Sequence, residues 1–539
     1  MLLRQAHFTT IIVVCIPIIF ALFVFVSYFH DGTLNVLPSH LSLRPSHEKP
    51  ALHKGPSHST TASPPAASQH TNIENEEAPP QHIGSPSTTT EPQSGNQQVA
   101  NQQVFPANDF LPARPIDPTC AHLPDLSKVL LIIKTGASET YDRLPTQFMT
   151  MARCLPDFLT FSDMEESLMG YRVYDILQDT VKEAKDDNGD FNLYRRQQDC
   201  LVDQKSCQKW SNAGGEAWNL DKYKNVRQSD VSYRMRPNYE WYIHIDADTY
   251  VHWPNMIQML SAFDPNKDHF FGSFEPSQYG DFNHGGSGYI LSQSAMKKFQ
   301  ANSSVEHFDH AARSICCGDM LMTIAVKENI GLGNTNLFPS INGRKPFTLA
   351  FGPRQWCQPI ATLHKLNSEE VASMWQFEQE RIANATDGKP APLLIRDLYY
   401  QWFAPRLVEK LEDWDNMYDD YLNNVEYYID YEDKAKDWEN FDDKKYVWHR
   451  KKPEDMKHPE EKKAHKSFDN CRKACEVLDE CMQFRWQDDA CAVSKNFRLG
   501  NPMEKKEKEK ERWMSGWMVK KIQKWIDEQE ECEVKFPTA

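Results

Sequence analysis

The middle of the chain predicts an α/β fold with a mainly parallel sheet, because strand-like apolar runs alternate there with helix-like segments. Three runs carry the prediction, at residues 128–134, 158–161 and 241–245. Residues 141–154 and 167–184 are expected to form helices between them. Sheets of this class bind ligands beyond the carboxyl ends of their strands, so the residues that follow each run are the first candidates for a site.

A membrane anchor is expected before this domain. Residues 8–29 carry no charged side chain, and 22 residues at about 1.5 Å each are enough to span a bilayer. Arg4 precedes the run and Asp31 follows it, so the positive-inside rule leaves residues 1–7 in the cytosol and the rest in a lumen. The alternative is a cleaved signal peptide. It is disfavoured because the run is long and no small-residue cleavage site follows.

Residues 30–118 are expected to form a flexible luminal stalk. They are rich in Pro, Ser, Thr, His, Gln and Asn, so they cannot bury enough apolar area to offset the entropy of ordering. The chain has 60 basic and 76 acidic residues, a net charge of −16, which argues against a general nucleic-acid partner. A mean hydropathy of −0.66 excludes a multi-span membrane protein.

The cysteines agree with an oxidising compartment. Cys15 lies inside the expected span, which leaves twelve of the 13 cysteines for luminal disulfides of undetermined connectivity. Because the chain lacks a Cys-x-x-Cys pair, a structural zinc site is disfavoured.

The most informative stretch is residues 241–260, where the third apolar run ends in Asp246 and Asp248, separated by Ala247. Two carboxylates this close repel each other unless a cation joins them, and Mn²⁺ and Mg²⁺ favour oxygen ligands. The alternative is an ordinary turn in which an aspartate caps the next helix. The pattern alone does not decide between the two.

Later segments add candidates of the same kind. Gly285 and Gly286 permit a close backbone approach, with a tight hairpin as the alternative. Asp319 precedes an apolar, helix-like stretch. His364 follows an apolar segment, where a histidine is more often structural, but a neutral imidazole there would complete a metal site.

A set of motifs in a fixed order is more specific than any one of them. They are KTGAS at 134–138, FSD at 161–163, WNLDKYK at 218–224, IDADTYVH at 245–252, HGGSGYILS at 284–292, GDM at 318–320 and the late His364. With these motifs, residues 125–375 resemble glycosyltransferase family 31, in particular the fungal members of its core 1 galactosyltransferase-like branch. The resemblance implies a GT-A fold, a Rossmann-like nucleotide-sugar fold, with a UDP-sugar donor and Mn²⁺, or else Mg²⁺, as cofactor.

The resemblance also implies roles for the matched residues. Asp248 and His364 would ligate the metal, and Asp246 would contact the ribose or the metal shell. Asp319 would be the general base that accepts the proton of the acceptor hydroxyl. The residues implied for the nucleotide pocket are Asp163 and Lys222, and those for the donor-sugar or acceptor cleft are Gly285 and Gly286.

Two positions depart from the family pattern. Ala247 stands where the family often has a third acid, and Gly318 replaces a glutamate before the base. The second change puts acceptor recognition and the orientation of Asp319 in doubt. Neither removes a group that the chemistry strictly needs.

The expected activity is therefore an inverting, metal-dependent transfer of a sugar, galactose first, from UDP to a glycan or glycoprotein acceptor in β-1,3 linkage. The expected location is the Golgi membrane, where the protein would be a single-pass type II protein. A homodimer is one option for its oligomeric state. One alternative is a non-catalytic luminal lectin or chaperone on the same fold. Another is a related enzyme that uses UDP-GlcNAc or UDP-glucose.

Beyond the domain expected at residues 119–404, an acidic connector is expected at 405–465 and a compact cysteine-rich α+β module at 466–539. The module resembles a PAN/Apple-like domain, on its Cys-x3-Cys-x5-Cys pattern and the aromatic strand at 483–486. It is too small to rely on an apolar core alone, so disulfides are expected to stabilise it. Two of its cysteines, Cys481 and Cys491, are candidates to pair with Cys471 and Cys475. A glycan or protein ligand is one expectation for the module, and a purely structural role is the other.

Overall fold

The computed structural model describes residues 117–208, 213–277, 279–386, 388–418, 425–428, 451 and 453–538. These residues belong to one compact unit, Val99–Ala539. The expected anchor at 8–29, and the expected stalk apart from its last two residues, lie outside the described part. Within that part, none of the helices combines the length and the apolar character that a membrane crossing needs.

The expected α/β architecture is confirmed by an eight-stranded sheet in the order β11-β7-β10-β5-β1-β2-β4-β3. β1 lies at its centre and pairs in parallel with both β2 and β5. β10 runs antiparallel to β5, so the sheet is mixed. Its strands are β1 (Val129–Lys134), β2 (Phe158–Ser162), β3 (Glu166–Leu168), β4 (Tyr171–Asp175), β5 (Trp241–Asp246), β7 (Phe270–Gly272), β10 (Tyr289–Ser292) and β11 (Thr335–Asn336).

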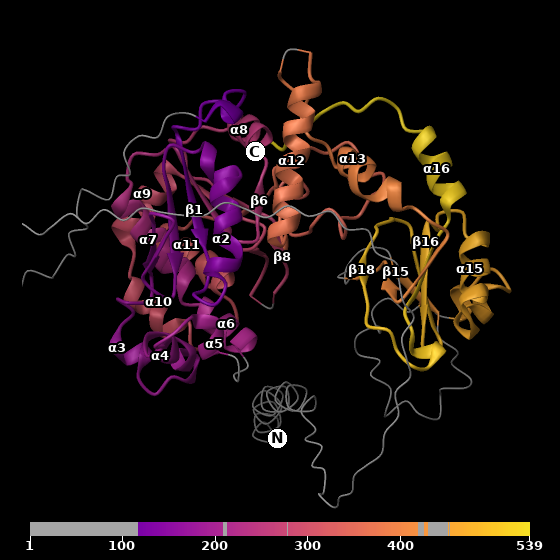
Figure 1. Ribbon diagram of the computed structural model, residues 1–539, viewed down its shortest axis with the longest axis horizontal. Helices are drawn as coiled ribbons and strands as arrows, with labels where there is room; N and C mark the ends of the chain where they lie inside the picture. Colours follow the sequence, from indigo (N-terminus) through magenta and orange to yellow (C-terminus); the bar gives the residue numbers. More distant parts are fainter. Residues whose placement is uncertain are drawn as a thin grey trace, which may run out of the picture. The chain divides into compact units, whose positions relative to one another are not determined.

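Helices cover both faces of the sheet, which explains why all six residues of β1 are buried. Figure 1 shows α7, α9 and α11 on one side of β1 and α2 on the other. Odd-numbered residues of β1 pack in one apolar cluster with α2 and α8, and even-numbered ones in a second cluster with α7, α9 and α11. These helices are α2 (Thr140–Met149), α7 (Lys224–Met235), α8 (Trp253–Leu260), α9 (Gln293–Asn302) and α11 (Gly318–Ile330).

Shorter elements complete this part of the chain. The helices are α3 (Lys182–Lys185), α4 (Asn192–Gln198), α5 (Gln204–Cys207), α6 (Ala213–Asp221), α10 (Val305–Ala311), α12 (Ser368–Asn384) and α13 (Ile395–Leu398). The short strands are β6 (Tyr250–Val251), β8 (Phe274–Glu275), β9 (Phe282–Asn283) and β12 (Thr362–Leu363).

The helix expected at residues 167–184 is wrong. That segment forms the hairpin of β3 and β4, and only Lys182–Lys185 is helical. Met169 and Gly170 both adopt positive φ, 54° and 83°, which is the backbone of a tight turn. β4 also extends the sheet by pairing with β2, which a helix would not do.

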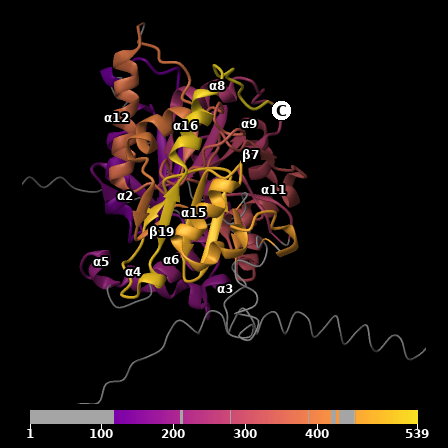
Figure 2. The ribbon, with the colours of Figure 1, turned by 90° about the vertical axis from the view of Figure 1, so that its right-hand side faces the viewer.

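The C-terminal part forms a second, five-stranded sheet in the order β13-β19-β16-β17-β15. Figure 2 shows α15 (Phe468–Val477) close to its yellow strands, and the helix packs on this sheet with Phe468 against Phe484. The strands and the last helix are β13 (Lys410–Glu412), β15 (Val425–Tyr428), β16 (Gln483–Gln487), β17 (Ala490–Ser494), β19 (Met514–Trp517) and α16 (Val519–Asp527), with β14 (Trp414–Asp415) and β18 (Asn501–Pro502) as a separate pair.

β13 and β15 lie in the segment expected to be a connector, 405–465. They pair with β19 and β17, so the C-terminal sheet begins earlier in the chain than the expected boundary at 466. Short strands that pair only with distant partners leave little trace in a charged segment, which is why the sequence did not reveal them.

All twelve cysteines outside the expected span form disulfides. Within the C-terminal module the four candidate cysteines pair with one another as expected, and the structure gives the connectivity that the sequence left open, Cys471 with Cys491 and Cys475 with Cys481. A third bridge, Cys357–Cys532, ties the end of the chain to the segment before α12. The remaining bridges are Cys120–Cys154, Cys200–Cys207 and Cys316–Cys317.

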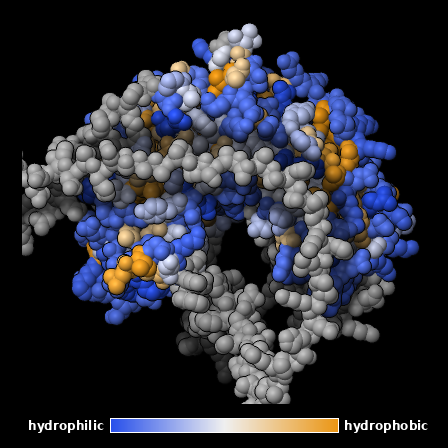
Figure 3. All heavy atoms as spheres, viewed as in Figure 1, coloured by the Kyte–Doolittle hydropathy of each residue, from blue (hydrophilic) through white to orange (hydrophobic). Residues whose placement is uncertain are grey.

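The described surface is largely polar. On the face shown in Figure 3, hydrophilic residues predominate and hydrophobic ones occur in small patches. Apolar side chains scattered over a protein surface are normal and need no functional explanation.

Candidate active site

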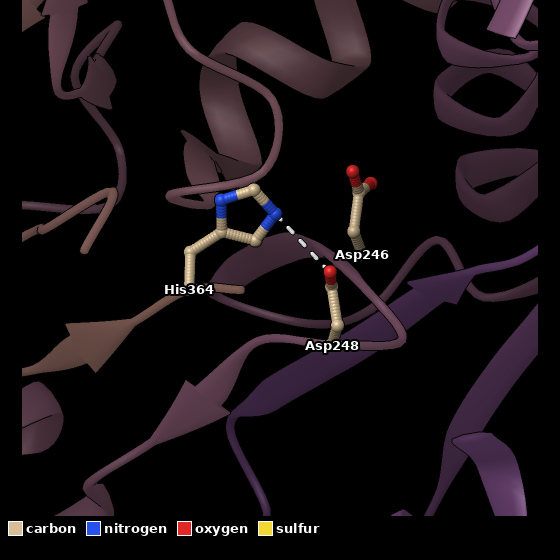
Figure 4. Close-up of side chains that lie close together, drawn as sticks. All are labelled: Asp246, Asp248 and His364. Carbon is tan, nitrogen blue, oxygen red and sulfur yellow. Dashed lines mark ion pairs between the residues drawn. The ribbon is translucent and has the colours of Figure 1, made fainter. Parts of the chain in front are cut away.

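Two separate strand pairs bring the candidate metal ligands together. Asp246 ends β5, and Asp248 follows it after one residue. The chain then enters β6, which pairs antiparallel with β12. His364 is the residue directly after β12, so this pairing returns it to the end of β5 from more than 110 positions further along the sequence. Figure 4 shows the imidazole and both carboxylates pointing into the same space.

The distances suit a divalent cation. Nε2 of His364 lies 3.1 Å from Oδ1 of Asp248. Asp246, Asp248 and His364 each offer one ligand atom, and these atoms lie within 4.8 Å of one another. Two carboxylates and one imidazole form a ligand set that suits Mn²⁺ and, through its oxygens, Mg²⁺. The three residues therefore fit the cation that the sequence predicts.

Two basic side chains of the protein lie next to the two carboxylates. Lys134 Nζ lies 3.2 Å from Asp246 Oδ1, and an Arg143 nitrogen lies 3.5 Å from Asp248 Oδ2. Burial raises the pKa of Asp246, and the charge of Lys134 offsets only part of that effect. Burial also acts to raise the pKa of Asp248, but the hydrogen bond and charge of His364 and the charge of Arg143 bring it below its ordinary value.

A row of alternating charges runs away from Asp246. Lys134 pairs with Asp221 as well as with Asp246, and Asp221 lies 3.6 Å from Lys224 Nζ. Lys224 in turn lies 3.0 Å from Asp163, whose side chain is fully buried. Because each charge has an opposite neighbour, the row is held in place electrostatically. Asp163, predicted from the FSD motif, is thus linked to Asp246 through three side chains.

The lysine predicted for this region is not the one that contacts Asp163. Lys222 Nζ lies 2.8 Å from Asp190 instead, whereas Lys224 also donates to the backbone oxygen of Thr135 at 2.9 Å. Asp221 ends α6 and Lys224 begins α7, so the turn between the two helices brings their side chains together. The sequence holds no signal for this turn that would have distinguished the two lysines.

Asp319 lies in the first turn of α11 and faces the loop that contains Gly285 and Gly286. Its Oδ2 accepts a hydrogen bond from the backbone N–H of Gly285 at 2.8 Å, and its Oδ1 accepts one from Met320 at 2.8 Å. Burial raises the pKa of the Asp319 carboxyl, and these hydrogen bonds offset part of the increase. A carboxylate with a raised pKa is a better proton acceptor near neutral pH.

The other glycine of the loop, Gly286, lies against the His364 ring. A Cβ atom at this position would be 2.1 Å from Cε1 and 2.3 Å from Nε2 of the imidazole. Thr249 Oγ1 holds the loop by donating to the Gly286 oxygen at 2.6 Å. The absent side chain is therefore what allows the ring to face Asp248.

Sequence reasoning also missed His284, although its motif was part of the resemblance. The two imidazoles, His284 and His364, lie edge to face with centroids 5.3 Å apart. Nδ1 of His284 and Ser287 Oγ are 2.6 Å apart. Burial lowers the pKa of His284 to about 3, so this ring is neutral at physiological pH.

Comparison with protein families agrees with this geometry. Residues 126–342 match the family model described as Fringe-like. The matched segment includes Asp163, Asp246, Asp248 and Asp319 and ends before His364. Its mixed α/β sheet is consistent with a GT-A-like domain. Residues 126–342 are therefore similar to the Fringe-like family, which belongs to glycosyltransferase family 31 and implies glycosyltransferase activity in general.

Proposed function

We propose that the protein is an inverting, metal-dependent glycosyltransferase that moves galactose from UDP-galactose to a glycan acceptor in β-1,3 linkage. The observation that carries the proposal is the meeting of Asp246, Asp248 and His364 at the end of β5, with both aspartates inside the Fringe-like segment 126–342. The same proposal places the protein in the Golgi membrane as a single-pass type II protein. The apolar run at 8–29 and the six disulfides support that location.

On the donor side, Asp246, Asp248 and His364 would hold Mn²⁺ or Mg²⁺. A cation held by these residues would supply positive charge to the diphosphate as the bond between the diphosphate and the sugar breaks. Lys134 adds a fixed positive charge beside Asp246. The buried pair of Asp163 and Lys224 keeps the nearby strand ends in place, where the nucleotide of the donor would bind.

On the acceptor side, Asp319 would take the proton. The acceptor oxygen forms a bond to the anomeric carbon while the bond from that carbon to the diphosphate breaks. The proton of the hydroxyl passes to the Asp319 carboxylate, and the bonding electrons leave with UDP. Attack from the face opposite the leaving group converts an α-linked donor sugar to a β-linked product. The Gly285 N–H, 2.8 Å from Oδ2, orients the carboxylate for this step.

Asp319→Asn tests the proposal because it removes the base and keeps the shape. We expect sugar transfer and UDP release to fall about 10²–10⁴-fold, the range that general acid–base catalysis contributes. Binding of Mn²⁺ and UDP, measured by calorimetry, should stay within a factor of about two. Asp281→Asn is the matched control, since Asp281 is exposed and its side chain has no place in the proposed site.

Normal turnover by Asp319→Asn would remove Asp319 from the mechanism. If the unmodified chain releases no UDP from UDP-galactose, UDP-GlcNAc or UDP-glucose but binds glycans, the protein is a lectin on this fold. Asp248→Asn separates these outcomes further, because glycan binding by a lectin would tolerate the loss of a metal ligand.

A further inference from the structure

A cavity of about 240 Å³ opens beside the candidate active site. His284 lines it, and the next residue donates to Asp319. Glu275 lines it too; burial raises the pKa of this carboxyl, and the charge of Asp319 adds to the increase. Lys365, directly after the metal-ligand candidate His364, lines it as well. The cavity therefore adjoins both the proposed base and the proposed metal site.

One wall of this cavity comes from the C-terminal module. Arg498 is among the lining residues, although every other one lies between positions 273 and 365. A two-way backbone bridge fixes the approach, because Phe351 N donates to Phe497 O at 2.7 Å and Phe497 N donates to Phe351 O at 3.0 Å. The backbone of Arg498 is held as well, by Gln483 and by the indole N–H of Trp517, each at 2.9 Å.

The module and the catalytic part also share one apolar core. Phe351 and Phe403 pack against Phe497, and Trp356 packs edge to face on Trp525. The Cys357–Cys532 disulfide covalently joins the same two parts. The module is thus built into the catalytic part, and the position of Arg498 is a fixed feature of the fold.

Arg498 brings a guanidinium to the cavity wall. It is 2% exposed, and a guanidinium carries five N–H donors in a fixed planar arrangement. Such a side chain can keep its partners within the protein and still donate a hydrogen bond to a polar molecule bound in the cavity.

Other lining groups suit a sugar ring. Thr348 Oγ1 and Gln355 Oε1 are buried and, within the described residues, lack a hydrogen-bond partner. Such atoms are costly unless a ligand pairs with them. Phe338 is 43% exposed at the rim, which offers an apolar surface to the C–H face of a sugar. The cavity thus combines hydroxyl partners with an apolar platform.

From these observations we propose that the cavity binds the acceptor saccharide and that Arg498 of the C-terminal module is one of its acceptor-binding residues. The proposal rests on the glycosyltransferase function argued above. It gives the module a role that differs from both earlier expectations, because the module neither binds a glycan by itself nor serves only as an appendage. Acceptor recognition would depend on a residue outside the Fringe-like segment.

The experiment uses the full-length chain and compares Arg498→Ala with Arg472→Ala. Arg472 is the matched control, an arginine of the same module on the exposed side of α15, where it pairs with Glu476. Two rates are measured with Mn²⁺: hydrolysis of UDP-galactose by water, and transfer to p-nitrophenyl α-N-acetylgalactosaminide. We expect Arg498→Ala to raise KM for the glycoside at least tenfold, with KM for UDP-galactose and the hydrolysis rate within a factor of two of the unmodified chain.

Thr348→Val covers the case in which Arg498→Ala fails to fold. Valine has nearly the shape of threonine, and the lost hydroxyl has no hydrogen-bond partner within the described residues, so stability should not fall. Here too we expect KM for the glycoside to rise, about three- to tenfold, and KM for the donor to stay constant.

The outcomes separate this proposal from the proposed function. If the unmodified chain neither hydrolyses nor transfers any UDP-sugar, the proposed function fails. If the unmodified chain transfers to the glycoside and both variants match its KM, only the acceptor-site proposal fails. A rise in KM for UDP-galactose instead of the glycoside would assign the cavity to the donor and would also overturn the proposal.

Discussion

Gly286→Ala should disable the site through a single methyl group. The added Cβ would lie 2.1 Å from Cε1 of His364, whereas ordinary contact begins near 3.4 Å, so the ring must move by about 1.3 Å. A displacement of about 1 Å at a reacting centre can cost on the order of 10²-fold in rate. We therefore expect kcat/KM for UDP-galactose to fall about 100-fold and the Kd for Mn²⁺ to rise at least tenfold.

The assays are Mn²⁺ titration by calorimetry and UDP release from UDP-galactose, with thermal unfolding to confirm the fold. Gly333→Ala is the control, because a Cβ at Gly333 meets no atom within 4 Å. Overpacking at Gly286 is expected to lower the free energy of unfolding by about 1–3 kcal/mol. The double variant Gly286→Ala/His364→Ala should recover this loss, since it removes the ring that the methyl group contacts.

The sharpest test of this reasoning compares the activity of the double variant with that of His364→Ala alone. If His364 binds the metal, the double variant should be no less active than His364→Ala alone, because the ring is already lost. Unchanged Mn²⁺ affinity and turnover in Gly286→Ala would show that the position of the His364 ring has no part in the function. Equal losses in Gly286→Ala and Gly333→Ala would assign the effect to loop flexibility instead.

Two further predictions concern buried ionisable groups outside the candidate metal site. Lys224→Met should lower the free energy of unfolding by about 3–5 kcal/mol because it leaves Asp163 buried without its partner, and Asp163→Asn added to it should recover part of the loss, as measured by urea denaturation. Burial raises the pKa of Glu378 to about 8, so the folded chain holds a proton that the unfolded chain, with a pKa near 4.5, releases. Stability from this group should therefore fall as pH rises from about 5 to 8, by at most roughly 1.4 kcal/mol per pH unit, and Glu378→Gln should flatten the pH dependence of the unfolding temperature. An unchanged slope in Glu378→Gln would show that this carboxyl is ionised in the folded chain.

The central strands and the two carboxylates after β5 could be predicted because their signals are local, whereas His364 was proposed only from the order of the motifs. The three apolar runs became β1, β2 and β5, and the carboxylates lie at the end of β5. The helix expected at 167–184 failed because a tight turn at Met169-Gly170 outweighed helical spacing. The roles of the site residues stay predictions, as do the likeness to the fungal branch and to a PAN/Apple-like module.

Features that depend on contacts between distant segments could not be predicted. The ion pair of Lys134 with Asp221 joins residues 87 positions apart, and nothing in either segment indicates the other. Arg498 reaches the cavity only because the C-terminal sheet packs on the catalytic part. The pair of Lys224 with Asp163 is of the same kind, because it joins residues of different elements.

The most direct test of the account is UDP release from UDP-galactose by the full-length chain, followed before and after Mn²⁺ is removed with EDTA. The site of Asp246, Asp248 and His364 predicts turnover with Mn²⁺, loss of turnover after chelation, and recovery when Mn²⁺ is restored. With a glycoside acceptor, proton NMR of the product should show a β-anomeric linkage. Turnover that EDTA leaves unchanged, or an α-linked product, would contradict the account.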